Sequence, residues 1–225
     1  MASPPFDHLL RLSTPLGVYE HASGPVPRTE HGMCVDDVAR ALVVTAREPD
    51  PAPEVAALAG TALRFLRAAQ RDDGAMHNRR DDAGTWLDTP STDDHWGRAL
   101  WAFGVTAACA TDDALAAEAR RGAEVAMRAR SPHPRATAYA ALGAARLLTV
   151  APEGLAAYVL LLDARRALLP LRTDPSWPWP YGRLTYASSA LPEAMLTGVL
   201  ERDRPRHARP PGGPLPPVTP KPETI

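Results

Sequence analysis

Apolar residues recur at the spacing of an α-helix through most of this chain, and this periodicity constrains the fold more than any other feature. In the segment 54–71, for example, Val55, Leu58, Ala62 and Phe65 fall on one face of a helix. The same spacing predicts helices at about 36–47, 54–71, 94–110, 113–130, 134–150 and 153–169, and from about residue 187. No alternating run of β-branched residues accompanies them. The sequence therefore predicts an all-α fold rather than a parallel α/β sheet.

The links between the expected helices alternate in length, which predicts how the helices pair. Links of only a few residues join the first helix to the second, the third to the fourth and the fifth to the sixth. Such links make antiparallel helical hairpins. The long segments 72–93 and 170–186 precede the third and seventh helices. We expect them to gather on one face of the domain and to carry function.

Two of the expected hairpins begin with the same residues, which indicates a repeated architecture. The segments 36–42 and 94–100 both read Asp, three residues, then Arg-Ala-Leu. Repeats of this kind are typical of stacked or circularly arranged helix pairs. The alternative interpretation is chance similarity in a sequence rich in alanine and arginine.

Charge and hydropathy exclude several classes of protein. The chain has 25 basic and 26 acidic residues, a net charge of -1, which gives no support to a nucleic-acid partner or an anionic membrane surface. No apolar run approaches the ~20 residues of a membrane span, and the first ten residues lack the pattern of a signal peptide. We therefore expect a cytoplasmic protein without membrane association, with Cys34 and Cys109 as reduced thiols.

The end of the sequence differs in composition from the rest. Residues 201–225 contain eight prolines and no aromatic residue, and proline at this density cannot continue a helix. We expect a helical domain at 1–200 and a disordered proline-rich tail at 201–225.

A first group of acidic and histidine residues precedes the first long helix. Its members are Glu20, His21, Glu30, His31, Asp36 and Asp37. Carboxylates here could simply cap the helix, which would account for Asp36 or Asp37 but not for the whole group. A zinc or manganese site is a further interpretation. Because no histidine pair has i, i+4 spacing and no Cys-x-x-Cys motif is present, we expect neither a metal nor another cofactor.

A second group, in and after the segment 77–82, combines amide, guanidinium, carboxylate and indole side chains. Its central members are His77, Asn78, Arg79, Trp86, Asp93, Asp94 and Trp96, and the later segment 177–186 adds Trp179 and Tyr186. Planar polar side chains bind adjacent sugar hydroxyls, and aromatic faces stack beneath sugar rings. The alternative is a surface loop with weak ion pairs, in which the tryptophans pack into the core.

Paired carboxylates would suit glycoside hydrolysis, which needs one group to protonate the leaving oxygen and another to activate water or attack the sugar. Asp36 or Asp37 could face Asp93 or Asp94 across a cavity, since the repeat places Asp36 and Asp94 at matching positions. The sequence contains no phosphate-binding glycine loop and no nucleophile elbow.

These motifs together are similar to those of a known family. They are Glu20-His21-Ala22, His31-Gly32, Cys34, Asp36-Asp37, Ala39-Arg40-Ala41-Leu42, His77-Asn78-Arg79, Ser91, Asp93 and Gly97-Arg98-Ala99-Leu100-Trp101. Over residues 6–200 the chain resembles bacterial proteins of the six-hairpin glycosidase-like group. Many of these are labelled glycosyltransferase, because the domain also occurs fused or adjacent to retaining sugar-nucleotide transferases. The resemblance implies antiparallel hairpins forming part of an (α/α)6 toroid, and a link to carbohydrate.

The resulting functional hypothesis is a carbohydrate-active protein that acts on or binds an oligosaccharide or polysaccharide. Its candidate catalytic residues are Asp36, Asp37, Asp93 and Asp94, and its candidate substrate-binding residues are Glu20, His21, His31, His77, Asn78, Arg79, Trp86, Trp96, Trp179 and Tyr186. Two alternatives are a glycan-binding accessory domain with a glycosyltransferase partner, and a helical-repeat scaffold without catalysis.

Two departures from the family bear on this hypothesis. Met33 stands where the family pattern leads us to expect an aromatic residue, usually tyrosine. A closed toroid of six hairpins needs about twelve helices, whereas this sequence offers about seven. We therefore expect a copy truncated at its C-terminal end, with unknown consequences for its activity.

Overall fold

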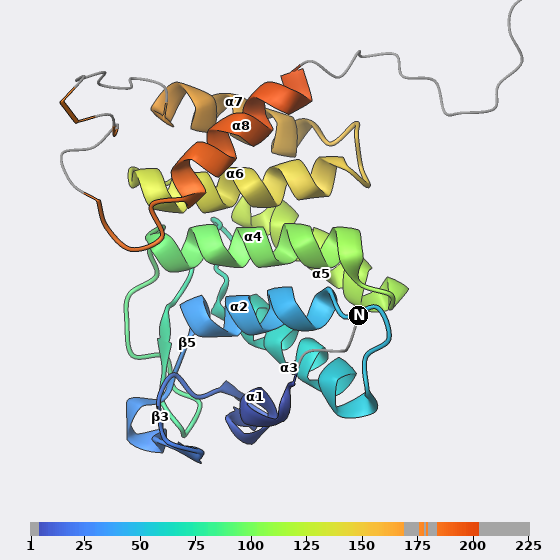
Figure 1. Ribbon diagram of the computed structural model, residues 1–225, viewed down its shortest axis with the longest axis vertical. Helices are drawn as coiled ribbons and strands as arrows, with labels where there is room; N and C mark the ends of the chain where they lie inside the picture. The colour runs from blue at the N-terminus through green and yellow to red at the C-terminus, as the bar shows by residue number, and fades with distance from the viewer. Residues whose placement is uncertain (1–4, 169–175, 178, 180–183, 203–225) are drawn as a thin grey trace, which may run out of the picture.

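The helices dominate the computed structural model, which describes residues 5–168, 176, 177, 179 and 184–202 (Figure 1). They are α1 (Asp7–Arg11), α2 (Val35–Ala46), α3 (Pro53–Ala69), α4 (Asp94–Cys109), α5 (Asp113–Ala126), α6 (Pro134–Leu148), α7 (Leu155–Leu168) and α8 (Ala190–Arg202). The all-α prediction is confirmed, because each of the seven expected segments overlaps one of the helices α2 to α8. Only α1, with five residues, was not expected from the periodicity.

The long helices form two layers. A front layer consists of α2, α4, α6 and α8, which stack side by side in that order (Figure 1). The helices α3, α5 and α7 lie behind, and each packs on the front helix that precedes it in the chain. The two repeat-matched helices, α2 and α4, lie side by side, as is typical of stacked helix pairs. The toroid itself stays a prediction.

The helices α4 and α6 approach one another closely because glycines remove the side chains between them. A Cβ atom on Gly97 would lie 2.2 Å from the carbonyl oxygen of Ala136, and one on Gly104 would lie 2.1 Å from that of Gly143. A Cβ on Gly143 would lie 2.3 Å from the carbonyl oxygen of Leu100. The residue numbers of the contacting pairs increase together along the two helices, from Gly97 with Ala136 to Gly104 with Gly143, so α4 and α6 run in the same direction. Their N-terminal ends therefore meet at one end of the layer.

The hydrophobic core lies between the two layers. Leu42 of α2, Phe65 of α3, Phe103 of α4 and Leu160 of α7 are each at most 2% exposed. The cluster continues into α8, where Leu191 is also buried. One continuous core thus joins all the long hairpins and holds the front layer in register.

Short strands attach the loops to the N-terminal end of α2. The antiparallel pairs are β1 (Ser13–Thr14) with β2 (Gly17–Val18), β3 (Ala22–Ser23) with β4 (Val26–Pro27), and β5 (Met33–Cys34) with β6 (Arg79–Arg80). A 3-10 turn, Thr29–His31, precedes β5. The third pair brings the segment 72–93 against the start of α2.

Parts of the expected organisation fall outside the description. The segments 169–175 and 180–183, which belong to the expected long loop, and the residues 203–225 of the expected tail lie outside the described residues. Helix α8 extends to Arg202, so it crosses the expected boundary at residue 200. None of the described helices combines the length and the apolar character needed to cross a membrane.

Candidate functional site

The candidate site lies where the front-layer helices begin. The N-terminal ends of α2, α4 and α6 and the turn before α8 share one end of the layer, which we call the rim; it is on the left in Figure 1. First-turn residues Asp36, Asp94 and Arg135 lie there, together with Tyr186 of the turn. Because helix N-termini carry partial positive charge, the rim favours acidic side chains.

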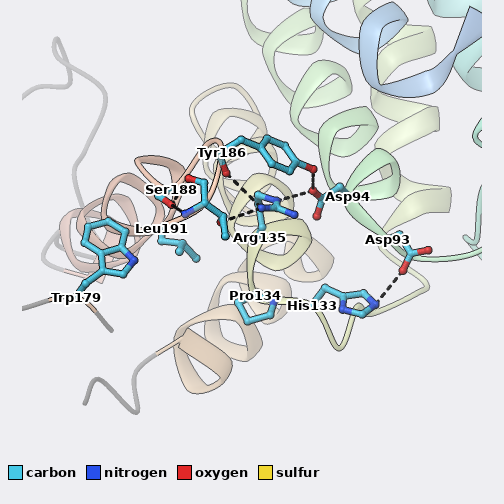
Figure 2. Close-up of a pocket in the computed structure, with 10 residues that line it drawn as sticks. Asp93, Asp94, His133, Pro134, Arg135, Trp179, Tyr186, Ser188 and Leu191 are labelled. Atoms are coloured by element: carbon cyan, nitrogen blue, oxygen red, sulfur yellow. Dashed lines mark hydrogen bonds and ion pairs between the residues drawn. The ribbon is translucent and has the colours of Figure 1, made fainter. Parts of the chain in front are cut away.

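Ion pairs connect neighbouring helices along the rim. The Nε of Arg98 on α4 lies 3.0 Å from Oδ1 of Asp36 on α2. On the next helix, Arg135 Nε donates to Oδ2 of Asp94 at 2.5 Å, and the Tyr186 hydroxyl donates to the same oxygen at 2.5 Å (Figure 2). Each acid of the repeat therefore pairs with an arginine on the following front-layer helix.

Two adjoining cavities open on the rim and share a wall formed by Asp93 and Asp94. The larger cavity has a volume of about 800 Å³, and Figure 2 shows the side chains around it. Its lining is Asp93, Asp94, His133, Pro134, Arg135, Trp179, Thr185, Tyr186, Ser188 and Leu191. The smaller, polar cavity has a volume of about 320 Å³ and is lined by Asp36, Asn78, Arg79, Asp88, Thr89, Ser91, Asp93, Asp94 and His95.

Aromatic and cationic groups stack beside the larger cavity. The guanidinium carbon of Arg135 lies 3.8 Å from the centre of the Tyr186 ring. The buried Arg98 lies 4.3 Å from the centre of the Tyr139 ring and 5.9 Å from that of Tyr186. These contacts hold both arginines and Tyr186 in fixed orientations beside Asp94.

Asp36 is the most unusual carboxyl group of the polar cavity. Its side chain is 25% exposed, and its Oδ1 is buried without a hydrogen-bond partner among the described residues. Arg98 is at ion-pair distance from this oxygen but does not form a hydrogen bond with it. Burial raises the pKa of Asp36, the charges of Arg98 and His95 lower it, and nearby Asp94 raises it. The raised pKa shows that desolvation outweighs the attraction to Arg98.

The carboxylate of Asp88 helps to hold the loop across the polar cavity. Asp88 accepts backbone N–H groups of Asn78, at 2.7 Å, and of Arg79, at 2.9 Å. The backbone oxygen of Asn78 in turn accepts the N–H of Val35 at the start of α2. The Oδ1 of Asn78 is buried and, within the described part of the chain, has no hydrogen-bond partner. Asn78 and Asp36 thus each bring a buried side-chain oxygen without a hydrogen bond to the wall of the polar cavity.

Asp93 and Asp37 differ from Asp36 in their surroundings. Asp93 accepts the Ser91 hydroxyl at 2.7 Å and lies 2.9 Å from His133 Nε2, between the two cavities. Asp37 pairs with Arg40 at 2.6 Å and accepts the thiol of Cys34 at 3.3 Å. It does not line either cavity, because it points toward the β5 side of α2.

The structure brings together about half of the expected site residues. Asp36, Asn78, Arg79, Asp93, Asp94, Trp179 and Tyr186 line the two cavities. The other expected residues, Glu20, His21, His31, Asp37, His77, Trp86 and Trp96, are not among the residues that line them. Of the four candidate catalytic acids, Asp36, Asp93 and Asp94 thus lie at the cavities, whereas Asp37 does not.

The two tryptophans of the second group pack against protein. Trp96 is 1% exposed, and its indole N–H donates to the carbonyl of Ala126 at 3.1 Å. The expectation that Trp96 binds substrate is wrong, because its side of α4 faces the core and α5. Trp86 stacks on His77 with ring centres 5.3 Å apart, and it also contacts Phe65. The stacked rings of Trp86 and His77 therefore support the loop and do not form the cavity wall.

Three basic residues of the rim, Arg98, His133 and Arg135, were not expected from the sequence as site residues. Arg98 belongs to the repeat, so its pattern could have drawn attention to it. Arg135 and His133 lie on either side of Pro134 at the start of α6, where no motif marks them. Their role depends on how α4 and α6 pack, which is a property of the fold.

Comparisons with known proteins leave the family open. No model of a known protein family matches this chain, and no curated protein matches it significantly. The likeness to the six-hairpin glycosidase-like group therefore stays a resemblance of motifs.

Proposed function

We propose that the chain binds an oligosaccharide or polysaccharide across the two cavities and acts on it as a glycosidase-like protein. The observation that carries this proposal is the shared wall at Asp94, with an aromatic cavity on one side and a polar, carboxyl-lined cavity on the other. A ligand that fills both must present apolar faces and many hydroxyl groups, a combination typical of linked sugar rings.

The lining of each cavity suits a different part of such a ligand. The larger cavity offers Trp179, Tyr186 and Leu191 as apolar surfaces for the C–H faces of a sugar. The polar cavity offers the amide of Asn78 and the guanidinium of Arg79, which donate to or accept from adjacent hydroxyls. A glycan lying across both would place a linkage next to Asp94.

Asp36 and Asp94 supply the two carboxyl groups that glycoside hydrolysis requires. In this mechanism Asp36 gives a proton to the leaving glycosidic oxygen, and Asp94 takes a proton from the attacking water or attacks the sugar carbon itself. Arg135 and Tyr186 anchor Asp94 in position. Of the two acids expected from the first long helix, this assignment keeps Asp36 and leaves out Asp37, which does not line either cavity.

A second candidate is binding without cleavage, as in an accessory domain beside a glycosyltransferase. The observation that favours it is the series of cross-helix ion pairs, because Asp36 and Asp94 also hold α2, α4 and α6 together. The same acids would then be structural, and the cavities would hold the glycan through Trp179, Asn78 and Arg79 alone.

The experiment is a measurement of both cleavage and binding on a panel of bacterial and plant polysaccharides. The variants are Asp36→Asn and Asp94→Asn, with Asp163→Asn as matched control. Asp163 also pairs with an arginine, Arg130 at 3.0 Å, but lies on α7 away from both cavities. Loss of cleavage in the two rim variants alone would support the hydrolase, and binding without cleavage in every variant would support the accessory domain. No binding to any member of the panel would refute both.

A further inference from the structure

A second group of reactive side chains lies on the β5 side of α2, outside the two cavities. One carboxylate oxygen of Glu20, the sulfur of Cys34 and one carboxylate oxygen of Asp37 all lie within 4.8 Å of one another. They come from three separate places, namely the segment between β2 and β3, the end of β5 and the first turn of α2. The fold therefore assembles a mixed sulfur and oxygen donor set that no motif in the sequence reveals.

The spacing of these atoms fits a small tetrahedral site. With a Zn–S distance of about 2.3 Å and a Zn–O distance of about 2.0 Å, neighbouring ligand atoms of a tetrahedron lie roughly 3.5 Å apart. The Cys34 sulfur lies 3.3 Å from Oδ2 of Asp37. This separation differs from the ideal edge by only a few tenths of an ångström, and all three ligand atoms lie within 4.8 Å of one another.

We propose that Glu20, Cys34 and Asp37, with a water molecule as the fourth ligand, form a binding site for one thiophilic divalent cation, best matched by Zn²⁺. A thiolate combined with carboxylates suits zinc, whereas magnesium and calcium prefer oxygen ligands alone. Cys34 is 3% exposed, and the side chains of Glu20 and Asp37 are 14% and 29% exposed, so a bound cation would be partly shielded from bulk water.

The two carboxylates of the group already attract positive charge, because each pairs with an arginine. Without metal, Glu20 pairs with Arg79 and Asp37 pairs with Arg40. The Cys34 thiol is protonated and donates a hydrogen bond to Asp37. On binding, the cation takes the place of the thiol proton, which passes to solvent, and the two exposed guanidinium groups turn toward water. Arg40 and Arg79 are about half exposed, at 49% and 46% of their side-chain surface, so this movement meets little resistance.

The test uses the full chain after removal of metal with EDTA and dialysis. Zn²⁺ is titrated while the thermal midpoint is recorded, and Co²⁺ is added as a spectroscopic probe of thiolate coordination. We expect one bound Zn²⁺ per chain, a raised midpoint, and a thiolate-to-cobalt absorption band. The variant Cys34→Ser should lose the band, and Cys109→Ser, which changes an exposed free thiol, should retain it.

Two further variants keep the test decisive if Cys34→Ser does not fold. Glu20→Gln and Asp37→Asn change charge but not size, and each should weaken Zn²⁺ binding roughly tenfold or more. Failure of the wild-type chain to bind Zn²⁺ at micromolar concentration would overturn the proposal. So would a cobalt band that persists in Cys34→Ser or disappears in Cys109→Ser, or unchanged affinity in both carboxylate variants. The result does not depend on any glycan, so it can fail while the proposed function holds.

Discussion

The close contact between α4 and α6 makes a quantitative prediction for the variant Gly104→Ala. Its new Cβ would lie 2.1 Å from the carbonyl oxygen of Gly143, whereas an ordinary contact begins at 3.4 Å. The two helices would have to separate by about 1.3 Å, the difference between these distances, or bend. Overpacking of this kind costs about 1–3 kcal/mol. A clash between two backbones belongs at the upper end of that range, because neither helix can rotate a side chain away.

One favourable effect opposes this cost. Alanine stabilises a helix by about 1 kcal/mol relative to glycine, so the net loss should be about 2 kcal/mol. For a chain of this size, the thermal midpoint should fall by about 4–8 °C. The control is Gly60→Ala on α3, where the new Cβ would meet only the flexible end of Arg64, at 3.3 Å. The control should be neutral or stabilised by up to about 1 kcal/mol.

Thermal and urea unfolding followed by circular dichroism measures both variants under the same conditions. A midpoint for Gly104→Ala equal to or above that of Gly60→Ala would refute the reasoning. It would show that the backbones of α4 and α6 are not in contact. The close packing that aligns the N-terminal ends of these helices at the rim would then be absent.

Three further predictions concern the rim and its support. Trp96→Phe removes a buried hydrogen bond to Ala126 and part of a core side chain, so unfolding by urea should show a loss of about 2–3 kcal/mol. Asp88→Asn leaves one acceptor for the N–H groups of Asn78 and Arg79, and hydrogen exchange at these amides should accelerate roughly tenfold, the equivalent of about 1.4 kcal/mol. Asp36 has a raised pKa in the folded chain, so the folded state retains this proton at a pH where the unfolded state has lost it. As the pH rises from about 4 through the folded pKa, the wild type should lose stability relative to Asp36→Asn, and at higher pH the difference in unfolding free energy should be constant. Urea titrations with EDTA at several pH values measure this difference. A difference that grows in the opposite direction would contradict the raised pKa of Asp36.

The helices could be predicted from the sequence because their signals are local. The apolar period and the short links identified α2 to α8, and the repeat at Asp36 and Asp94 correctly placed α2 beside α4. The short strands were not expected, since two-residue pairs leave no alternating pattern. Their formation depends on which loops the helices bring together.

Helical geometry explains which of the expected residues of α4 lie on the rim. Successive residues of an α-helix are about 100° apart around its axis, so Trp96 lies about 200° from Asp94 and faces the core. Arg98 lies about 40° from Asp94 on the same face, and it is the residue that reaches Asp36. This periodicity alone favours Arg98 over Trp96 as a rim residue. The contribution of Arg135 could not be found in this way, because it depends on the register between α4 and α6.

The donor group at Glu20, Cys34 and Asp37 shows a different limit of sequence reasoning. Metal motifs are recognised when ligands are close in sequence and on one face of an element. Here the ligands come from the segment between β2 and β3, a strand end and a helix start. The bridge between Tyr19 and Met33 and the hydrogen bond from Glu20 N–H to Gly32 bring the first of them to the others. The expectation that no metal binds rested on local spacing, which such a site does not have.

The most direct test of the proposed function is the position of a bound glycan. The measurement is a crystal structure of the chain with an oligosaccharide fragment of the polysaccharide that binds best in the panel, using Asp94→Asn to prevent turnover. The account predicts sugar rings in both cavities, one ring against Trp179 or Tyr186, and a glycosidic oxygen within hydrogen-bond distance of Asp36. A glycan bound elsewhere on the chain, with both cavities holding only water, would contradict it.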